Sequence, residues 1–468
     1  MTMPPIAGEP ATALGRPKDT SAKKIISWAM WDWGTQPFNT VIITFVFAVY
    51  LTSSSFGNTN QTSQALSVST TIAGLVVALA APVLGQTVDR SGRTVTVLRG
   101  LTWTLALISA LLFFVRPDPS YLWLGLGLLG FGSIINEIAG VNYNSLLDDV
   151  AGEANVGRVS GFGWGMGYLG GIVVLLVIYF GFIQPDVGWF GVTGDDGMDI
   201  RVSMLVCAIW TLLFTIPTFV SLHDRPQAQR RPIPGIEVYR GKQPRWIWGW
   251  LAPVIASYAE LAATIGRLWK LSRHTVYFLA ASALFRDGLA GVFAFGAVIA
   301  AGTFGFSSGD VVVFGAAANI VAGLSTIAFG LLDDKIGPKK VIIMALVALI
   351  LMGTVVFVLH DGGAIVFWVA GLIMCMFVGP AQSASRSFLA RLIPEGKSGE
   401  VFGLYATTGR VVSFLSPALF GIAIAVGARV TGQENTQYWG ILGIVVVLAI
   451  GLAVMIPVKE HTEHTRVL

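Results

Sequence analysis

The sequence predicts an all-α polytopic membrane protein whose twelve transmembrane helices form two pseudo-symmetric six-helix bundles. Composition, a count of apolar stretches and an internal repeat each support this fold class. Of the 468 residues, 54% are hydrophobic and 12% are charged, against about 25% charged residues in a typical soluble domain. So few charges could not cover the surface of a soluble protein of this size. The composition therefore excludes an ordinary soluble enzyme.

Twelve apolar stretches are long enough to cross a bilayer, which takes about 20 mostly apolar residues. The first six form an N-terminal bundle within residues 25–222, and the last six form a C-terminal bundle within residues 274–458. The stretches lie at 26–52, 65–88, 94–115, 121–147, 157–184, 201–222, 274–302, 308–332, 339–360, 364–393, 400–428 and 436–458.

The segments outside the two bundles are more polar. Residues 1–24 are rich in Pro, Gly and Ala and are expected to form a disordered tail, and residues 459–468 form a second tail. Residues 223–273 link the bundles. Within this linker the stretch from Trp246 to Lys270 is almost apolar enough to span, but Glu260 and Arg267 interrupt it. We interpret it as an amphipathic helix at the membrane interface; a helix packed only against protein is the alternative.

The basic residues predict the orientation of the chain. If the N-terminus is cytoplasmic, only Arg116, Arg201 and Arg429 among the 30 Lys and Arg residues fall in outer segments. Because cytoplasmic segments carry the excess of Lys and Arg, both termini and the linker are expected in the cytoplasm, and in a bacterium the membrane would be the plasma membrane. The net charge of +4 has the same explanation, so no nucleic-acid partner is expected.

A short basic loop occurs once in each predicted bundle. Both copies read Gly-x-x-x-Asp-(Arg/Lys)-x-Gly, and a positive-inside loop alone would not require that pattern twice. The residues are Gly85, Asp89, Arg90, Gly92 and Arg93 in the first copy, and Gly330, Asp334, Lys335 and Gly337 in the second. These loops resemble the signature of the major facilitator superfamily. The resemblance implies a carrier that works by alternating access, with these loops taking part in gating.

Three further motifs are similar to one branch of that superfamily, the vacuole-effluxer-like family, which is named after a fungal autophagy-related amino-acid effluxer. They lie at Trp31–Gly34, Arg158–Gly171 and Gln382–Pro394. This resemblance extends from about Trp28 to Pro457 and implies amino-acid efflux. The chain departs from the family pattern where Thr35-Gln36 replaces Asn-Ser, and where Arg286-Asp287-Gly288 replaces Asn-Asp-Gly.

Polar residues inside the spans are the candidates for a substrate and coupling site. A charge at the bilayer centre costs about 2.5–3.5 kcal/mol on insertion scales, so each one needs a role. At about 1.5 Å per residue, several lie near the midplane, where transporters place their sites. The alternative is that the charges only pair to hold the bundles together. The candidates are Asp32, Asn39, Asn136, Glu137, Arg286, Asp287, Gln382, Arg386 and Arg410.

The charged candidates comprise three acids and three bases, which suits a zwitterion. We therefore expect a secondary active transporter of a small polar or zwitterionic metabolite, with an amino acid and efflux favoured, and with Glu137 as the candidate for a coupled proton. One alternative is an exporter of amphipathic drugs or lipids. Another is a non-transporting receptor or scaffold on the same fold. The expected partners are the substrate, protons and membrane lipids, and the expected state is a monomer.

Enzyme chemistry and cofactors are not expected. Cys207 and Cys375 lie far apart in sequence, and the five histidines lack the spacing of metal ligands. The glycines at 165, 167 and 170 match a dinucleotide fingerprint, but they lie within a predicted span and follow no strand. Gly163, Gly167 and Gly171 instead form a small-residue stripe for close helix packing.

The predicted orientation can be tested by cysteine labelling at the linker. In intact cells, a Gly235→Cys variant should resist a membrane-impermeant maleimide until the cells are permeabilised, because the linker is predicted to be cytoplasmic. An Arg116→Cys variant, in a predicted outer loop, should react without permeabilisation. Labelling of position 235 from outside would overturn the topology.

Overall fold

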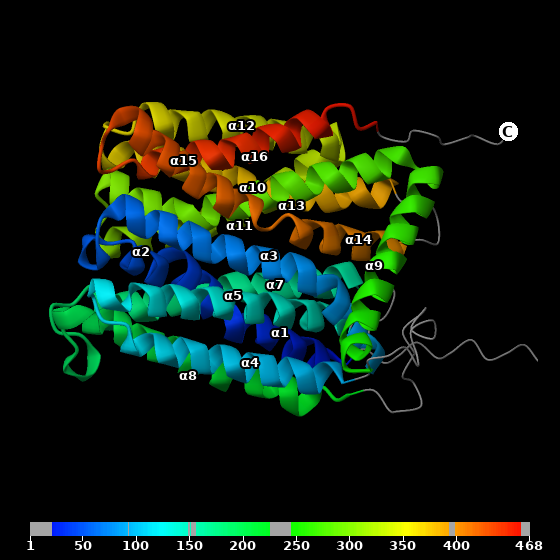
Figure 1. The fold of residues 1–468 in the computed structure, drawn as a ribbon, viewed down its shortest axis with the longest axis horizontal. Helices are drawn as coiled ribbons and strands as arrows, with labels where there is room; N and C mark the ends of the chain where they lie inside the picture. Colours follow the sequence, from blue (N-terminus) through cyan, green and yellow to red (C-terminus); the bar gives the residue numbers. More distant parts are fainter. Residues whose placement is uncertain are drawn as a thin grey trace, which may run out of the picture.

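Twelve helical spans run side by side along the long axis of the molecule (Figure 1). The computed structural model describes residues 21–91, 93–147, 150, 156–224, 245–392 and 398–459. All regular elements in these ranges are helices, and twelve stretches are long and apolar enough to cross a membrane. The predicted fold class is confirmed.

The N-terminal bundle contains six spans. α1 packs against α7 and α8, while α5 packs against α3 and α4. The main helices are α1 (Ala22–Pro37), α2 (Phe47–Leu51), α3 (Thr59–Ser91), α4 (Thr94–Leu111), α5 (Leu122–Ser145), α7 (Val156–Ile178) and α8 (Met198–Ser221). The π-helices and 3-10 helices that extend or join them are η1 (Phe38–Phe45), η2 (Ser54–Phe56), η3 (Leu112–Phe114), η4 (Pro119–Tyr121), η5 (Tyr179–Ile183), η6 (Trp189–Gly191) and η7 (Asp195–Gly197).

The C-terminal bundle contains the other six spans. α13 packs against α11 and α12, and α16 packs against α10, α12 and α15. The helices are α10 (Arg273–Phe304), α11 (Ser308–Ile336), α12 (Pro338–Val358), α13 (Ala364–Leu392), α14 (Ser398–Val411), α15 (Leu415–Thr431), η10 (Gln437–Trp439) and α16 (Gly440–Met455).

The glycine stripe on α7 packs against α1, as the sequence predicts. A Cβ added to Gly163 would lie 2.6 Å from the Trp28 ring, and one added to Gly171 would lie 2.7 Å from the Thr40 hydroxyl. At Gly167 the added Cβ would meet Asp32 at 3.5 Å. The stripe therefore lets α1 and α7 approach closely, which is its usual role between membrane helices.

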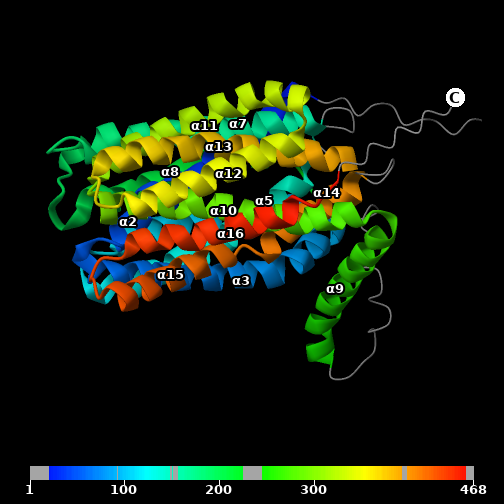
Figure 2. The ribbon, with the colours of Figure 1, turned by 90° about the horizontal axis from the view of Figure 1, so that it is seen from above.

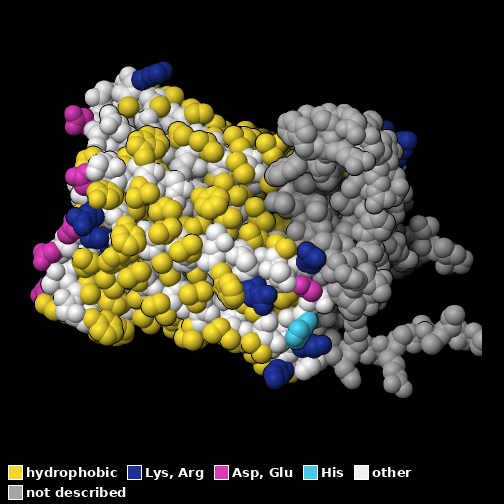
Figure 3. All heavy atoms as spheres, turned by 60° about the horizontal axis from the view of Figure 1, so that its bottom comes forward, with side chains coloured by type: hydrophobic (Ala, Val, Ile, Leu, Met, Phe, Trp, Pro, Cys, Tyr) yellow, Lys and Arg dark blue, Asp and Glu magenta, His cyan; other side chains and the backbone are white. Residues whose placement is uncertain are grey.

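Hydrophobic side chains cover most of the visible flank of the molecule, and charged side chains gather toward its ends (Figure 3). Large apolar side chains remain exposed on this fold, among them Leu79, Trp123, Val220, Ile365 and Val430. A soluble protein seldom exposes so much contiguous apolar surface. In a bilayer these side chains face lipid.

In two spans, a change of helix type or a break lies next to a proline. Proline has no amide hydrogen and cannot bond to the carbonyl four residues earlier. Pro37 ends α1, and the span continues as the π-helix η1 before α2. Pro417 cannot donate to Ser413, and the eleventh span breaks between α14 and α15.

The two bundles contact each other through α3 and the eleventh span. Near one end of the molecule, Asn60 Oδ1 accepts a hydrogen bond from the Thr436 amide at 2.7 Å. Further along α3, the Ser67 hydroxyl donates to the Pro417 carbonyl. Gly74 then packs directly on Phe414, where an added Cβ would lie 2.8 Å from its Cα. The end of the molecule that contains Asn60 and Thr436 is here called the far end. The contacts join the bundles from the far end toward the middle.

The linker helix α9 (Arg245–Leu271) crosses the opposite end, here called the α9 end (Figures 1 and 2). It is not one of the twelve candidate spans. Residues 1–20, 225–244 and 460–468 of the two predicted tails and the linker lie outside the described residues. α1 begins at Ala22, inside the predicted tail, and α10 begins at Arg273.

Candidate transport site

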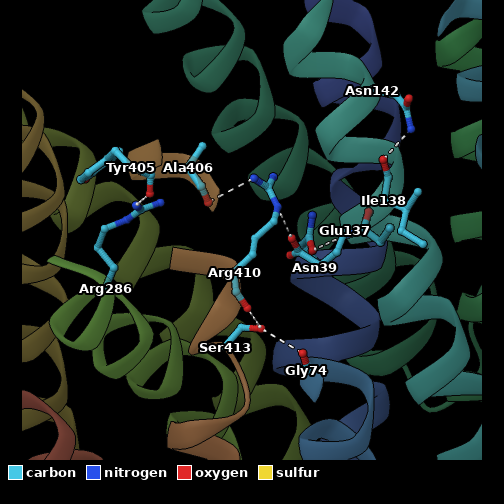
Figure 4. A network of polar contacts seen from close by, with 11 residues as sticks. Asn39, Gly74, Glu137, Ile138, Asn142, Arg286, Tyr405, Ala406, Arg410 and Ser413 are labelled. Atoms are coloured by element: carbon cyan, nitrogen blue, oxygen red, sulfur yellow. Dashed lines mark hydrogen bonds and ion pairs between the residues drawn. The ribbon is translucent and has the colours of Figure 1, made fainter. Parts of the chain in front are cut away.

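An ion pair joins the two bundles where the site is expected. Arg410 Nε on α14 lies 3.5 Å from Glu137 Oε2 on α5 (Figure 4). The Arg410 side chain is 19% exposed and that of Glu137 is 50% exposed. Glu137 is thus half accessible in this conformation.

Arg410 has spare capacity to bind an anion. Its Nη1 donates to the carbonyl of Ala406 on its own helix at 3.4 Å. Its buried Nε has no hydrogen-bond partner among the described residues, although the Glu137 carboxylate lies nearby. Because a guanidinium carries five N–H donors, a bound carboxylate could accept bonds that this arrangement leaves unmade.

Arg286 is held next to Arg410 from the C-terminal bundle (Figure 4). Its Nη1 donates to the Tyr405 carbonyl at 2.8 Å, and its guanidinium lies 4.0 Å from the centre of the Tyr405 ring. The Tyr405 hydroxyl is in turn hydrogen-bonded to Ser385 on α13. Arg386, Arg410 and Glu137 all lie close enough to act on Arg286 electrostatically.

Asn39 and Asn136 are also brought together, on the N-terminal side of the ion pair. Asn136 Nδ2 donates to Asn39 Oδ1 at 2.9 Å. Asn39 lies in the π-helix η1, and its carbonyl accepts a bond from the Thr44 hydroxyl at 2.7 Å. Short π-helical segments within membrane helices often occur at functional sites, and this one lies directly after Pro37.

Arg386 lies across the bundle interface from Trp164. Its guanidinium is 5.0 Å from the Trp164 ring on α7, and both side chains are exposed. This contact joins α13 to the N-terminal bundle. Gln382, one turn before Arg386, is partly exposed, and its carbonyl accepts a bond from Ser385 at 2.8 Å.

Asp287, a candidate for the substrate site, contacts the eleventh span within the C-terminal bundle. Its Oδ2 accepts a hydrogen bond from the Ser416 amide at 2.7 Å, and the residue is only 5% exposed. Ser416 lies in the first turn of α15, where amides have no partner within the helix. Asp287 therefore caps the helix that begins after the break, and its charge is favourable at a helix N-terminus.

Asp32 lies inside the N-terminal bundle, next to Tyr143 on α5. Trp28 and Trp31 stack on the Tyr143 ring, each with centroids 4.3 Å apart. The contacts given for Asp32 and Asp287 thus lie within their own bundles. Among the described residues, Arg286 lies within electrostatic reach of Arg386, Arg410 and one acid, Glu137.

The two repeated loops lie at the ends of α3 and α11. Gly85, Asp89 and Arg90 fall within α3 and Arg93 precedes α4, while Gly330, Asp334 and Lys335 fall within α11. Gly337 has a φ of 89°, which only glycine adopts readily, and it turns the chain into Pro338 and α12. Gly92 and the side chains of Gly85–Arg90 and Asp334 lie outside the described residues.

Two residues of the site are not among those predicted from the sequence. Tyr405 positions Arg286, and the Ser416 amide donates to Asp287. In the sequence, Tyr405 is followed by four small residues and then Arg410. A large aromatic residue in that place could have been selected as a site candidate. Ser416 precedes Pro417, which marks a helix start. Among the described residues, no group of three or more His, Cys, Asp or Glu could hold a metal ion.

Comparison with known proteins identifies the family. The model of the family described as "Vacuole effluxer Atg22 like" matches residues 153–466, about two thirds of the chain. The chain belongs to the Atg22-like family. The model of the Major Facilitator Superfamily also matches, over residues 8–175. The Atg22-like chain therefore has the family and the fold of transporters, not of enzymes.

Relatives agree with this assignment. An uncharacterized MFS-type transporter, YxiO of Bacillus subtilis (strain 168), is 26% identical over 93% of this chain and 95% of its own length. Autophagy-related protein 22 of Coccidioides immitis (strain RS) is 27% identical over 56% of this chain. The match spans only 43% of that fungal protein.

Solved structures show the same fold at low identity. A D-xylose–proton symporter has a TM-score of 0.62 and 14% identity, with 94% of this chain and 97% of that chain covered. The xylose transporter XylE from E. coli, in an inward-open conformation, has a TM-score of 0.58 and 12% identity, with 94% and 96% covered. These likenesses confirm the major facilitator fold of the Atg22-like chain.

The capping role of Asp287 can be tested by two substitutions. Asp287→Ala should lower the thermal unfolding midpoint in detergent, because a buried amide left without a partner costs about 1–3 kcal/mol. Asp287→Asn keeps an oxygen acceptor and should retain most of the stability. Equal, wild-type stability of both variants would contradict the capping role.

Proposed function

We propose that this transporter moves a small zwitterionic metabolite, with an amino acid as the favoured substrate, by alternating access between the two bundles. The Arg410–Glu137 pair carries the proposal. It offers a cation and a carboxylate 3.5 Å apart at the bundle interface, which matches the two charges of an amino acid. The carboxylate of the substrate would bind Arg410 and Arg286, and the ammonium group would bind Glu137 with Asn39 and Asn136.

The direction and the membrane are part of the same proposal. The matching family model is described as a vacuole effluxer, which favours efflux. We assign the α9 end to the cytoplasm from the distribution of Lys and Arg, with both termini on that side and a monomer as the transporting unit. In a bacterium the membrane would be the plasma membrane.

A second candidate substrate is a small organic anion. Among the residues that the structure describes, Arg286 lies close to two further arginines, Arg386 and Arg410, and to one carboxylate, that of Glu137. Guanidinium groups bind carboxylates through paired hydrogen bonds, so the surplus favours a substrate with a carboxylate whether or not it carries an amine. Exporters of amphipathic drugs and a non-transporting scaffold remain the alternatives that a flux experiment must separate.

Flux into proteoliposomes tests the substrate. We expect saturable uptake from a mixture of amino acids, inhibited by free amino acids and not by their carboxyl amides. Arg410→Gln should reduce the apparent affinity about tenfold to a hundredfold, because a hydrogen bond to a charged group contributes about 1.5–3 kcal/mol. Arg429→Gln, at an exposed arginine on α15, is the matched control. Flux of dicarboxylates alone would favour the organic anion, and flux with no candidate would favour the scaffold.

Proton coupling through Glu137 is tested separately. Protonation of Glu137 would remove the ion pair with Arg410, so proton binding and closure of the bundles can influence each other, as coupling requires. Glu137→Gln should leave substrate exchange measurable but abolish its response to a pH gradient. Glu434→Gln, at an exposed acid near the far end, should keep that response. If Glu137→Gln still accumulates substrate when a pH gradient is applied, Glu137 does not carry the proton.

A further inference from the structure

The linker helix α9 exposes a continuous apolar stripe. Its residues are exposed and recur at intervals of four and three, which places them on one face of the helix. The two largest are Ile255, 37% exposed, and Trp269, 40% exposed. We call this face the α9 stripe, and it consists of Ile255, Ala259, Ala262, Gly266 and Trp269.

Cationic residues flank the Trp269 end of the α9 stripe. Arg267, Lys270 and Arg273 are all exposed, and the Arg273 guanidinium lies 5.7 Å from the Trp269 ring. An apolar face with Trp and basic neighbours is typical of helices that lie in the interface of an anionic membrane. Tryptophan is also enriched at that depth of the bilayer.

The placement of α9 agrees with such a role. The helix runs across the bundle helices and projects beyond the edge of the bundle (Figure 2). It contacts α3 of the N-terminal bundle and α10 of the C-terminal bundle. A helix that bridges the bundles at one end, and continues outward at that level, can touch the surface of the surrounding leaflet.

One hydrogen bond connects α9 to the backbone of α3. The Tyr258 hydroxyl lies 3.0 Å from the Leu79 carbonyl oxygen and 3.4 Å from that of Ala78. The residue four positions after Ala78 is Pro82, which has no amide hydrogen, so the Ala78 carbonyl lacks its usual helical donor. Tyr258 supplies a donor at this point of the chain. The same helix α3 carries the Ser67 and Gly74 contacts between the bundles.

We propose that the α9 stripe binds the anionic leaflet at the α9 end, and that the Tyr258 hydrogen bond couples this docking to the position of α3. Anionic lipid then holds α9 at the membrane surface. Through Tyr258, α9 holds α3 at Ala78 and Leu79, which follow Ser67 and Gly74 along that helix. The membrane surface thereby regulates a helix that must move when the bundles rock. The proposal does not depend on which substrate is carried.

Docking is tested by the accessibility of a spin label in the stripe. The label is attached to Ala262→Cys in the full-length protein after Cys207 and Cys375, both buried, are replaced by Ala. In phosphatidylcholine vesicles containing phosphatidylglycerol, the label should collide with oxygen more than with an aqueous nickel complex. Combined Arg267→Gln, Lys270→Gln and Arg273→Gln should weaken docking roughly a hundredfold, since each basic residue near an anionic surface contributes about fivefold to binding.

The matched control exchanges the same residues without loss of charge, as Arg267→Lys, Lys270→Arg and Arg273→Lys, and should dock as the wild type does. A label at Leu107→Cys, on the exposed face of α4, should not respond to lipid charge. A label at position 262 that stays open to the nickel complex in anionic vesicles would overturn the proposal. So would equal protection in vesicles of phosphatidylcholine alone, which would indicate that protein covers the stripe.

The coupling is tested by the distance between labels at Ala262→Cys on α9 and Ile72→Cys, at an exposed position on α3. Tyr258→Phe removes only the hydroxyl and should broaden this distance distribution in anionic vesicles. Tyr121→Phe, in η4 on another part of the chain, is the control and should leave the distribution unchanged. A narrow, wild-type distribution in Tyr258→Phe would show that the hydrogen bond does not hold α3 and would overturn the coupling.

Discussion

The hydrocarbon core of a bilayer offers no hydrogen bonds, so every backbone amide and carbonyl within it needs a partner from the protein. Most of this chain meets that requirement with unbroken helices. Near two of its prolines, a side chain from another element supplies a backbone partner. Asp287 accepts the Ser416 amide at the start of α15, and Tyr258 donates to the carbonyls before Pro82. These two helices are therefore tied to their neighbours close to a proline.

The same constraint explains why Arg286, Arg410 and Asp287 each contact a polar or charged group of another residue. Arg286 is stacked on Tyr405 and bonded to its carbonyl, whereas Arg410 reaches across the interface toward Glu137. The second arrangement is the weaker one, because its contacts are long and one donor is unpaired. A weak contact between the two bundles can be replaced by contacts with a substrate. Alternating access requires such a replaceable contact.

Much of the fold could be predicted from the sequence because apolar length and basic loops are local properties. The twelve spans and the glycine stripe on α7 follow from spacing along single helices. The site was less predictable. Asp287 and Arg286 are adjacent in sequence, yet their side chains lie on different faces of α10 and serve different partners. Only the packing of α14 and α15 distinguishes them.

By itself the sequence determined the class of the protein, the number of spans and the set of charges that need an explanation, because hydrophobicity and helical period act over short stretches of chain. The tertiary structure decided which charges meet. It placed Arg410 against Glu137, directed Asp287 to a helix terminus and brought Arg286 close to Arg386 and Arg410. These outcomes depend on how helices from two bundles rotate and approach, and contacts between residues hundreds of positions apart are not encoded in any local pattern.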